Sequence, residues 1–80
     1  MKFDTFTIPF IILMRDWQDA MQSRKGWRKG QLLFNTLAQL APEVSESLRG
    51  TEKDPYYDDK KIPDALAWIY TTLKEWEEAK

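Results

Sequence analysis

Apolar side chains recur three or four positions apart along most of the chain, which is the spacing of amphipathic helices. The longest stripe predicts a terminal helix that begins at Ile62 or Pro63 and ends near Glu78. A second stripe predicts a helix over residues 31–41, and Pro42 opens a third, short helix over residues 42–49. The stripe of the terminal helix consists of Ile62, Leu66, Ile69, Leu73 and Trp76.

The N-terminal residues carry two competing patterns. Apolar residues alternate with polar or small ones over residues 6–10, which is typical of a short edge strand. Pro9 can instead open a helix, because proline is favoured in the first helical turn. The apolar stripe of that helix is Phe10, Met14, Trp17 and Met21. We therefore expect an extended segment over residues 1–8 and a helix from about Pro9 to Ser23.

Length and composition limit the fold class. The chain has 80 residues, of which 42% are hydrophobic and 31% charged, an ordinary globular balance. This length allows one small domain with a thin core. The patterns predict a single all-α domain of three or four helices, to which a short N-terminal strand could be added. The apolar run over residues 8–14 is far shorter than the ~20 residues of a membrane span, so we expect a cytoplasmic protein.

The residue types that are missing exclude most catalytic chemistry. The chain has no Cys and no His, so it has no thiol nucleophile, disulfide or imidazole base. It also has no glycine-rich phosphate loop and no zinc-ligand spacing. Asp54, Asp58 and Asp59 lack the spacing of a calcium loop, and nearby lysines neutralise their charge. We therefore expect no enzymatic activity, no cofactor and no bound metal.

A basic segment predicts a turn between the first two helices. It contains two glycines and Trp27 among four basic residues, which are Arg24, Lys25, Arg28 and Lys29. Such a segment could hold phosphates while Trp27 stacks on a base, which would suit a small nucleic-acid-binding regulator. In the alternative interpretation the segment is a solvated loop and Trp27 packs against the core.

Charge is unevenly distributed along the chain. Residues 1–40 contain six Lys or Arg and three Asp or Glu, whereas residues 41–80 contain six and ten. The halves therefore carry net charges of +3 and −4, which sum to the net −1 of the chain. This distribution favours steered protein association over general nucleic-acid binding, which usually needs a high isoelectric point.

Two short motifs resemble a known group of proteins. They read Gly30-Gln31-x-x-Phe34-Asn35 and, after Pro42, Leu48-Arg49-Gly50-Thr51-x-x-Asp54-Pro55-Tyr56-Tyr57-x-Asp59. A chain with these motifs resembles small, mostly uncharacterised proteins carried by bacteriophages and prophages. The resemblance covers roughly residues 27–76 and leaves residues 1–21 without a counterpart. It implies a phage context and supplies no established activity.

The second motif also has a structural interpretation. Gly50 permits a left-handed turn, and Thr51 and Asp54 can accept hydrogen bonds from backbone NH groups. Arg49 can pair with Asp54 or Asp59. The two tyrosines could then close the loop over the aromatic ring of the first motif. In the functional interpretation the same loop is a contact surface.

The phage resemblance, the small size and the aromatic content of 14% together predict a function. We expect a non-enzymatic phage or prophage accessory protein that binds and inhibits a host protein, such as an anti-defence factor of the anti-CRISPR type. Interface hot spots are rich in aromatic residues and arginine. The expected contact residues are Trp27, Arg49, Tyr56, Tyr57, Asp58, Asp59 and Trp68. The expected core rings are Trp17, Phe34 and Trp76.

Two alternatives stay open. The first is the nucleic-acid-binding regulator that would use the basic segment. The second is a homo-oligomeric structural or virion accessory protein. Its protomers would bury apolar residues of the N-terminal segment between them, namely Phe3, Phe6, Ile8 and Phe10.

Overall fold

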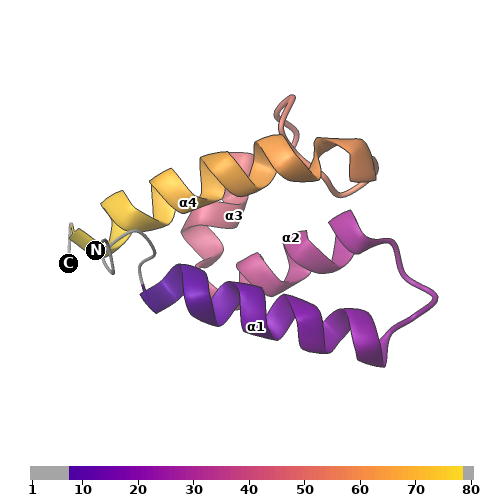
Figure 1. Ribbon diagram of the computed structural model, residues 1–80. Helices are drawn as coiled ribbons and strands as arrows, with labels where there is room; N and C mark the ends of the chain where they lie inside the picture. The colour runs from indigo at the N-terminus through magenta and orange to yellow at the C-terminus, as the bar shows by residue number, and fades with distance from the viewer. Residues whose placement is uncertain (1–7, 79–80) are drawn as a thin grey trace.

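The computed structural model describes residues 8–78, and these residues form an all-α fold (Figure 1). The elements in chain order are α1 (Ile8–Ser23), α2 (Lys29–Leu40), α3 (Pro42–Leu48), the 3₁₀ helix η2 (Asp59–Lys61) and α4 (Ile62–Glu78). The described residues contain no strand. The predicted fold class is therefore confirmed.

The helix boundaries follow the apolar stripes closely, with two corrections. Ile8 is the first residue of α1, so the predicted extended segment is wrong at this residue, while residues 1–7 lie outside the described part of the chain. α2 begins at Lys29, two residues before the predicted start. Gly30 is therefore a buried helical residue and does not belong to the turn. A close contact with another part of the chain, described below, explains why this helical position is a glycine.

Each helix packs against the next one along the chain (Figure 1). α1 and α2 are antiparallel and are joined by the turn over residues 24–28, while α4 runs alongside α3 and α1. α2 contacts α1, α3 and η2, so it is the central element. The α1–α2 turn and the loop that precedes α4 lie at the same end of the molecule. This arrangement brings the basic segment close to the second sequence motif.

One core cluster receives side chains from all four helices. Its large, fully buried members are Leu13 in α1, Leu33 and Leu37 in α2, Leu48 in α3, and Ile69 and Leu73 in α4. Trp17 and Phe34 are buried in the same cluster, as their stripes predict. Apolar burial of this kind is the main force that holds such a small domain together.

Two aromatic residues differ from their predicted positions. Trp76 is only half-buried, and its indole NH donates a hydrogen bond of 2.6 Å to the Glu43 carboxylate. Trp76 therefore links the last turns of α4 to α3 at the edge of the core, because its polar NH requires a partner. Phe10 is buried against Tyr70, with ring centroids 5.4 Å apart and near-perpendicular planes. Phe10 thus belongs to the core of its own chain, which corrects its predicted burial between protomers.

The outer side of α1 exposes two apolar residues near its start. Ile8 and Ile11 are both exposed, whereas the predicted partners of Ile8 in self-association, Phe3 and Phe6, lie outside the described residues. Among residues 8–78, no helix combines the length and the apolar character that a bilayer crossing requires.

Candidate functional site

The start of α2 is joined to the loop that precedes α4 by three hydrogen bonds. The backbone NH of Gly30 donates to Oδ1 of Asp59 at 2.9 Å. Nη2 of Arg28 donates to the backbone oxygen of Tyr56 at 2.6 Å, and Nε2 of Gln31 donates to the Tyr56 hydroxyl at 3.2 Å. The two sequence motifs, far apart along the chain, therefore meet in one place, which we call the α2–loop junction (Arg28, Gly30, Gln31, Tyr56 and Asp59).

The junction explains the glycine at position 30. A Cβ atom there would overlap the carbonyl oxygen of the buried Pro55, so the close approach of helix and loop needs a residue without a side chain. The local N-cap residue of α2, Arg28, makes no capping hydrogen bond with its side chain. Asp59 supplies that hydrogen bond and places a negative charge at the positive end of the helix dipole.

The turn after α3 has the internal contacts that its sequence predicts. Gly50 has a φ of +77°, in the left-handed region. The Asp54 carboxylate accepts hydrogen bonds from the backbone NH groups of Gly50 at 2.8 Å and Tyr56 at 2.9 Å. The Thr51 hydroxyl donates to the oxygen of Leu48 at 2.8 Å and accepts from the NH of Lys53 at 3.2 Å. The motif is therefore rigid for local reasons as well as through the junction.

Arg49 does not pair with Asp54 or Asp59, which corrects a prediction. Both carboxylates already accept hydrogen bonds from backbone NH groups. The guanidinium of Arg49 instead contacts Glu46 at 3.2 Å and lies over the Phe34 ring, 5.2 Å from its centroid. The charge of Arg49 therefore lies at the surface, above the edge of the core.

Two exposed aromatic rings lie beside arginines at this end of the molecule. Trp27 is 43% exposed and has the Arg24 guanidinium 5.2 Å from its ring centroid. Tyr57 is 81% exposed and has the Arg28 guanidinium at 5.6 Å. Cation–π contacts of this type hold a guanidinium in place over a ring. Arg28 is held further by the hydrogen bond from its Nη2 to the backbone oxygen of Tyr56.

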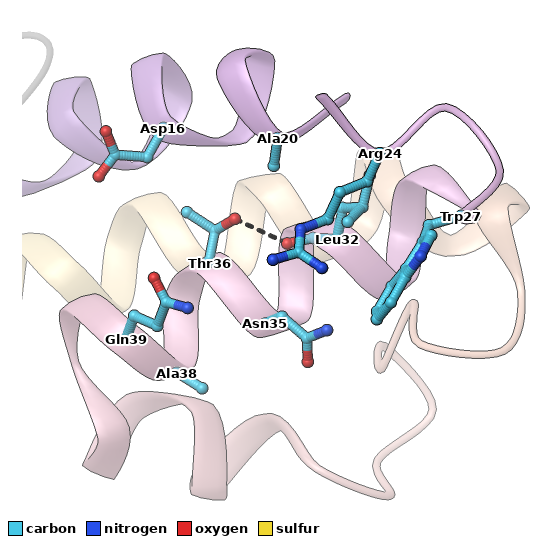
Figure 2. A pocket seen from close by; sticks show the side chains of 9 residues that line it. All are labelled: Asp16, Ala20, Arg24, Trp27, Leu32, Asn35, Thr36, Ala38 and Gln39. Atoms are coloured by element: carbon cyan, nitrogen blue, oxygen red, sulfur yellow. Dashed lines mark hydrogen bonds between the residues drawn. The ribbon is translucent and has the colours of Figure 1, made fainter. Parts of the chain in front are cut away.

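Two hollows lie on either side of α2. The first has a volume of about 460 Å³ and lies between the end of α1, the basic turn and α2 (Figure 2). The second, of about 410 Å³, lies between α2 and the turn after α3. Asn35 and Ala38 line both hollows and so form the ridge between them. We call this surface the α2 face, and it consists of Arg24, Trp27, Asn35, Ala38, Arg49 and Tyr57.

Two arginines at and beside the α2 face, Arg24 and Arg28, have no carboxylate partner in the described part of the chain. Within residues 8–78, no carboxylate lies within 4.0 Å of the guanidinium of Arg24 or Arg28. Asp16 lines the first hollow, but Arg15 pairs with it at 3.2 Å. Asp54 lines the second hollow, and its carboxylate is held by backbone NH groups. The acids at the two hollows are thus engaged within the chain. Neither arginine is paired with a carboxylate of the described residues, although Nη2 of Arg28 donates to the backbone oxygen of Tyr56.

The remaining predicted site residues lie outside this surface. Trp68 is half-buried against the core on α4 and lines neither hollow. Asp58 accepts a hydrogen bond from the NH of Lys60 at 2.9 Å and so caps η2, while Asp59 belongs to the α2–loop junction. Lys25 and Lys29 are exposed around the basic turn but also line neither hollow. Acidic side chains of the described residues form no group of three that could hold a metal ion.

Sequence reasoning missed the ridge of the α2 face. Asn35 and Ala38 lie off the apolar stripe of α2, where the sequence predicts an ordinary solvent-facing side of the helix, and both are half-buried. The amide of Asn35 makes no hydrogen bond to any of residues 8–78. The sequence signal for a role of Asn35 was a polar residue inside a leucine-rich helix, because such a residue often makes a specific contact.

Comparison of the chain with protein-family models finds no match. Comparison with curated proteins and with solved structures finds no significant match either. The resemblance to phage proteins therefore stays a prediction, and the α2 face is the basis for a functional proposal.

Proposed function

We propose that this chain is a non-enzymatic binding protein that holds another protein against its α2 face. The observation that carries the proposal is the pair of exposed rings, Trp27 and Tyr57, each beside an arginine and next to an open hollow. Aromatic residues and arginine supply most of the binding energy at protein interfaces. Two such anchors on either side of one helix make a compact interface.

The rigidity of the surrounding backbone supports this proposal. Gly50 and Asp54 lie in a turn closed by short hydrogen bonds, and the α2–loop junction connects that loop to the helix. A surface that is ordered before binding loses less conformational entropy when a partner docks. The acids in this region also act within the fold, since Asp54 and Asp59 accept backbone hydrogen bonds. A binding role therefore fits these side chains better than acid–base chemistry.

The biological setting of the proposal comes from the two sequence motifs. Their resemblance to phage and prophage proteins supports an accessory protein that inhibits a host protein, as an anti-defence factor of the anti-CRISPR type would. The test is the plating of phage on hosts with and without a defence system, each expressing this chain. We expect more plaques on a defended host, and loss of the effect with Trp27→Ala combined with Tyr57→Ala.

The matched control is Lys74→Ala, which removes an exposed charge from α4 and lines neither hollow. This variant should plate like the original chain. Equal plating on all hosts, with and without the gene, would contradict the inhibitory role.

A second candidate function is nucleic-acid binding, which the four exposed basic residues around Trp27 favour. A mobility-shift assay with single-stranded and double-stranded DNA and RNA separates it from the first proposal. Binding that weakens steeply with salt concentration would support the second candidate, because phosphate contacts release counterions. No shift at low salt would exclude it.

A further inference from the structure

The charge and shape of the α2 face indicate which kind of protein it fits. We propose that the partner presents an acidic segment that crosses α2 and places one carboxylate in each hollow. This inference rests on the proposed protein-binding function and adds the chemistry of the partner. A guanidinium and a carboxylate form paired, charge-assisted hydrogen bonds, the strongest polar contacts available to these residues.

The first hollow offers Arg24 as the anchor. Figure 2 shows its guanidinium reaching over α2 toward Asn35, with the Trp27 ring beside it. Asp16 lies at the opposite end of this hollow and is paired with Arg15. The positive charge of Arg24 is therefore uncompensated, while the indole ring restricts its motion. A carboxylate of the partner would complete this arrangement.

The second hollow offers Arg49. Its ion pair with Glu46 is exposed on both sides, with 60% and 66% of the two side chains accessible. Such surface pairs contribute little and can be exchanged for a partner's carboxylate. Gly50 leaves open space beside the arginine, since a Cβ there would meet no atom within 4 Å. Arg28, over the Tyr57 ring, adds a second positive charge at the rim.

The ridge between the hollows suits the backbone of an extended segment. The amide of Asn35 can both donate and accept a hydrogen bond, which are the two contacts that a peptide unit offers. Ala38 is small, so a partner's backbone can approach α2 closely at this position. An acidic segment could therefore lie across the ridge while its side chains enter the hollows on either side.

The acids within the hollows favour an acidic protein segment over a nucleic acid. Asp16 lines one hollow and Asp54 the other, so a continuous chain of phosphates would meet negative charge at both. Nucleic-acid interfaces are strongly positive throughout, whereas this chain has a net charge of −1. Separate carboxylates, in contrast, can reach the arginines and avoid the aspartates.

The test is an NMR titration of the full-length, ¹⁵N-labelled chain with a synthetic peptide of alternating Glu and Tyr. We expect shifts at the indole NH of Trp27, the side-chain amide of Asn35 and the backbone NH of Gly50. The same peptide with Gln in place of Glu should bind at least roughly tenfold more weakly, as expected for loss of charged hydrogen bonds. Arg24→Ala and Arg49→Ala should each weaken binding of the Glu peptide to a similar extent.

Lys74→Ala is again the control, since it lowers the net charge equally and should leave the affinity within about twofold. Equal binding of the Glu and Gln peptides, or shifts confined to other surfaces, would overturn the inference. Stronger shifts of the same signals with a single-stranded oligonucleotide would also overturn it, in favour of phosphates.

The plating assay and the peptide titration together distinguish a failure of this inference from a failure of the proposed function. If Trp27→Ala combined with Tyr57→Ala abolishes the plating effect while the acidic peptide fails to bind, the acidic partner is wrong and the inhibitory function stands. If the acidic peptide binds as expected but expression of the chain does not change plating on any host, the acidic partner stands and the inhibitory function is wrong.

Discussion

The carboxylate of Asp59 accepts a hydrogen bond of 2.9 Å from the backbone NH of Gly30, although 29 positions separate the two residues. The contact caps α2 from a distant part of the chain, because the side chain of the adjacent Arg28 makes no capping bond. It also fixes the loop that carries Tyr57 relative to the helix that carries Asn35. The shape of the α2 face therefore depends on this hydrogen bond.

Removal of this cap should destabilise the fold. We expect Asp59→Ala to lower the free energy of unfolding by about 1 kcal/mol, the usual cost of losing a helix N-cap. Urea denaturation followed by circular dichroism measures this change. Glu52→Ala is the control, since its side chain is 89% exposed and its pair with Lys53 spans 4.0 Å. Equal losses in the two variants would show that Asp59 acts only as a surface charge.

A side chain at position 30 should separate α2 from the loop. Gly30→Ala places a Cβ against the carbonyl oxygen of Pro55, and overpacking of this kind costs about 1–3 kcal/mol. The better helix propensity of alanine, worth about 1 kcal/mol, offsets only part of that loss. Gly26→Ala is the matched control, because a Cβ there meets no atom within 4 Å. The prediction is wrong if both variants unfold at the same urea concentration.

The helices could be predicted because each has a local signature, whereas the junction has none. The stripe of α4 marks its buried side residue by residue, and Ile69 and Leu73 are fully buried as that stripe requires. Gly30 looked like a turn residue, because glycine usually interrupts helices. The close approach of Pro55, far along the chain, explains why a glycine occupies this position inside α2.

The exposed rings of the site could be predicted from the sequence, whereas the ridge between the hollows could not. Trp27 and Tyr57 lie in charged segments away from any apolar stripe, and their exposure could be predicted from that position. The ridge of Asn35 and Ala38 becomes a feature only when α1 and the turn after α3 flank α2. That arrangement depends on tertiary packing, which periodicity along one helix does not specify.

The left-handed turn after α3 should tolerate asparagine better than alanine. Gly50 has a φ of +77° and room for a Cβ, so substitution there introduces backbone strain without a clash. We expect Gly50→Ala to cost about 1–2 kcal/mol in urea denaturation. Gly50→Asn should cost less, because asparagine adopts this conformation more readily. A larger loss with asparagine would mean that the backbone conformation does not determine the effect.

The buried tryptophan of α1 should matter more than the exposed one after it. Nε1 of Trp17 donates a hydrogen bond of 3.0 Å to the backbone oxygen of Lys29, and its side chain is buried. Trp17→Phe removes that bond and leaves a small cavity, so we expect a loss of about 1–3 kcal/mol. Trp27→Phe, at an exposed ring, should change stability by less than about 0.5 kcal/mol. Thermal and urea unfolding of both variants test the contrast.

The two adjacent tyrosines of the loop should have different roles, Tyr56 in stability and Tyr57 in binding. The Tyr56 ring packs edge-on against Phe34 at 5.7 Å, and its hydroxyl accepts a hydrogen bond from Gln31. The neighbouring Tyr57 is 81% exposed, with Arg28 over its ring. Tyr56→Ala should therefore lower the free energy of unfolding by about 2–3 kcal/mol, whereas Tyr57→Ala should change it by less than about 0.5 kcal/mol.

Binding should show the complementary pattern at temperatures where both variants are folded. Tyr57→Ala should weaken the titration with the Glu and Tyr peptide, because it removes an exposed ring and the support of the Arg28 guanidinium. Tyr56→Phe is the informative partner, since it keeps the ring against Phe34 and loses only the hydroxyl bond to Gln31. It should bind the peptide like the original chain. If Tyr57→Ala instead unfolds the protein and leaves binding per folded molecule unchanged, the loop has only a structural role and Tyr57 is not part of the binding surface.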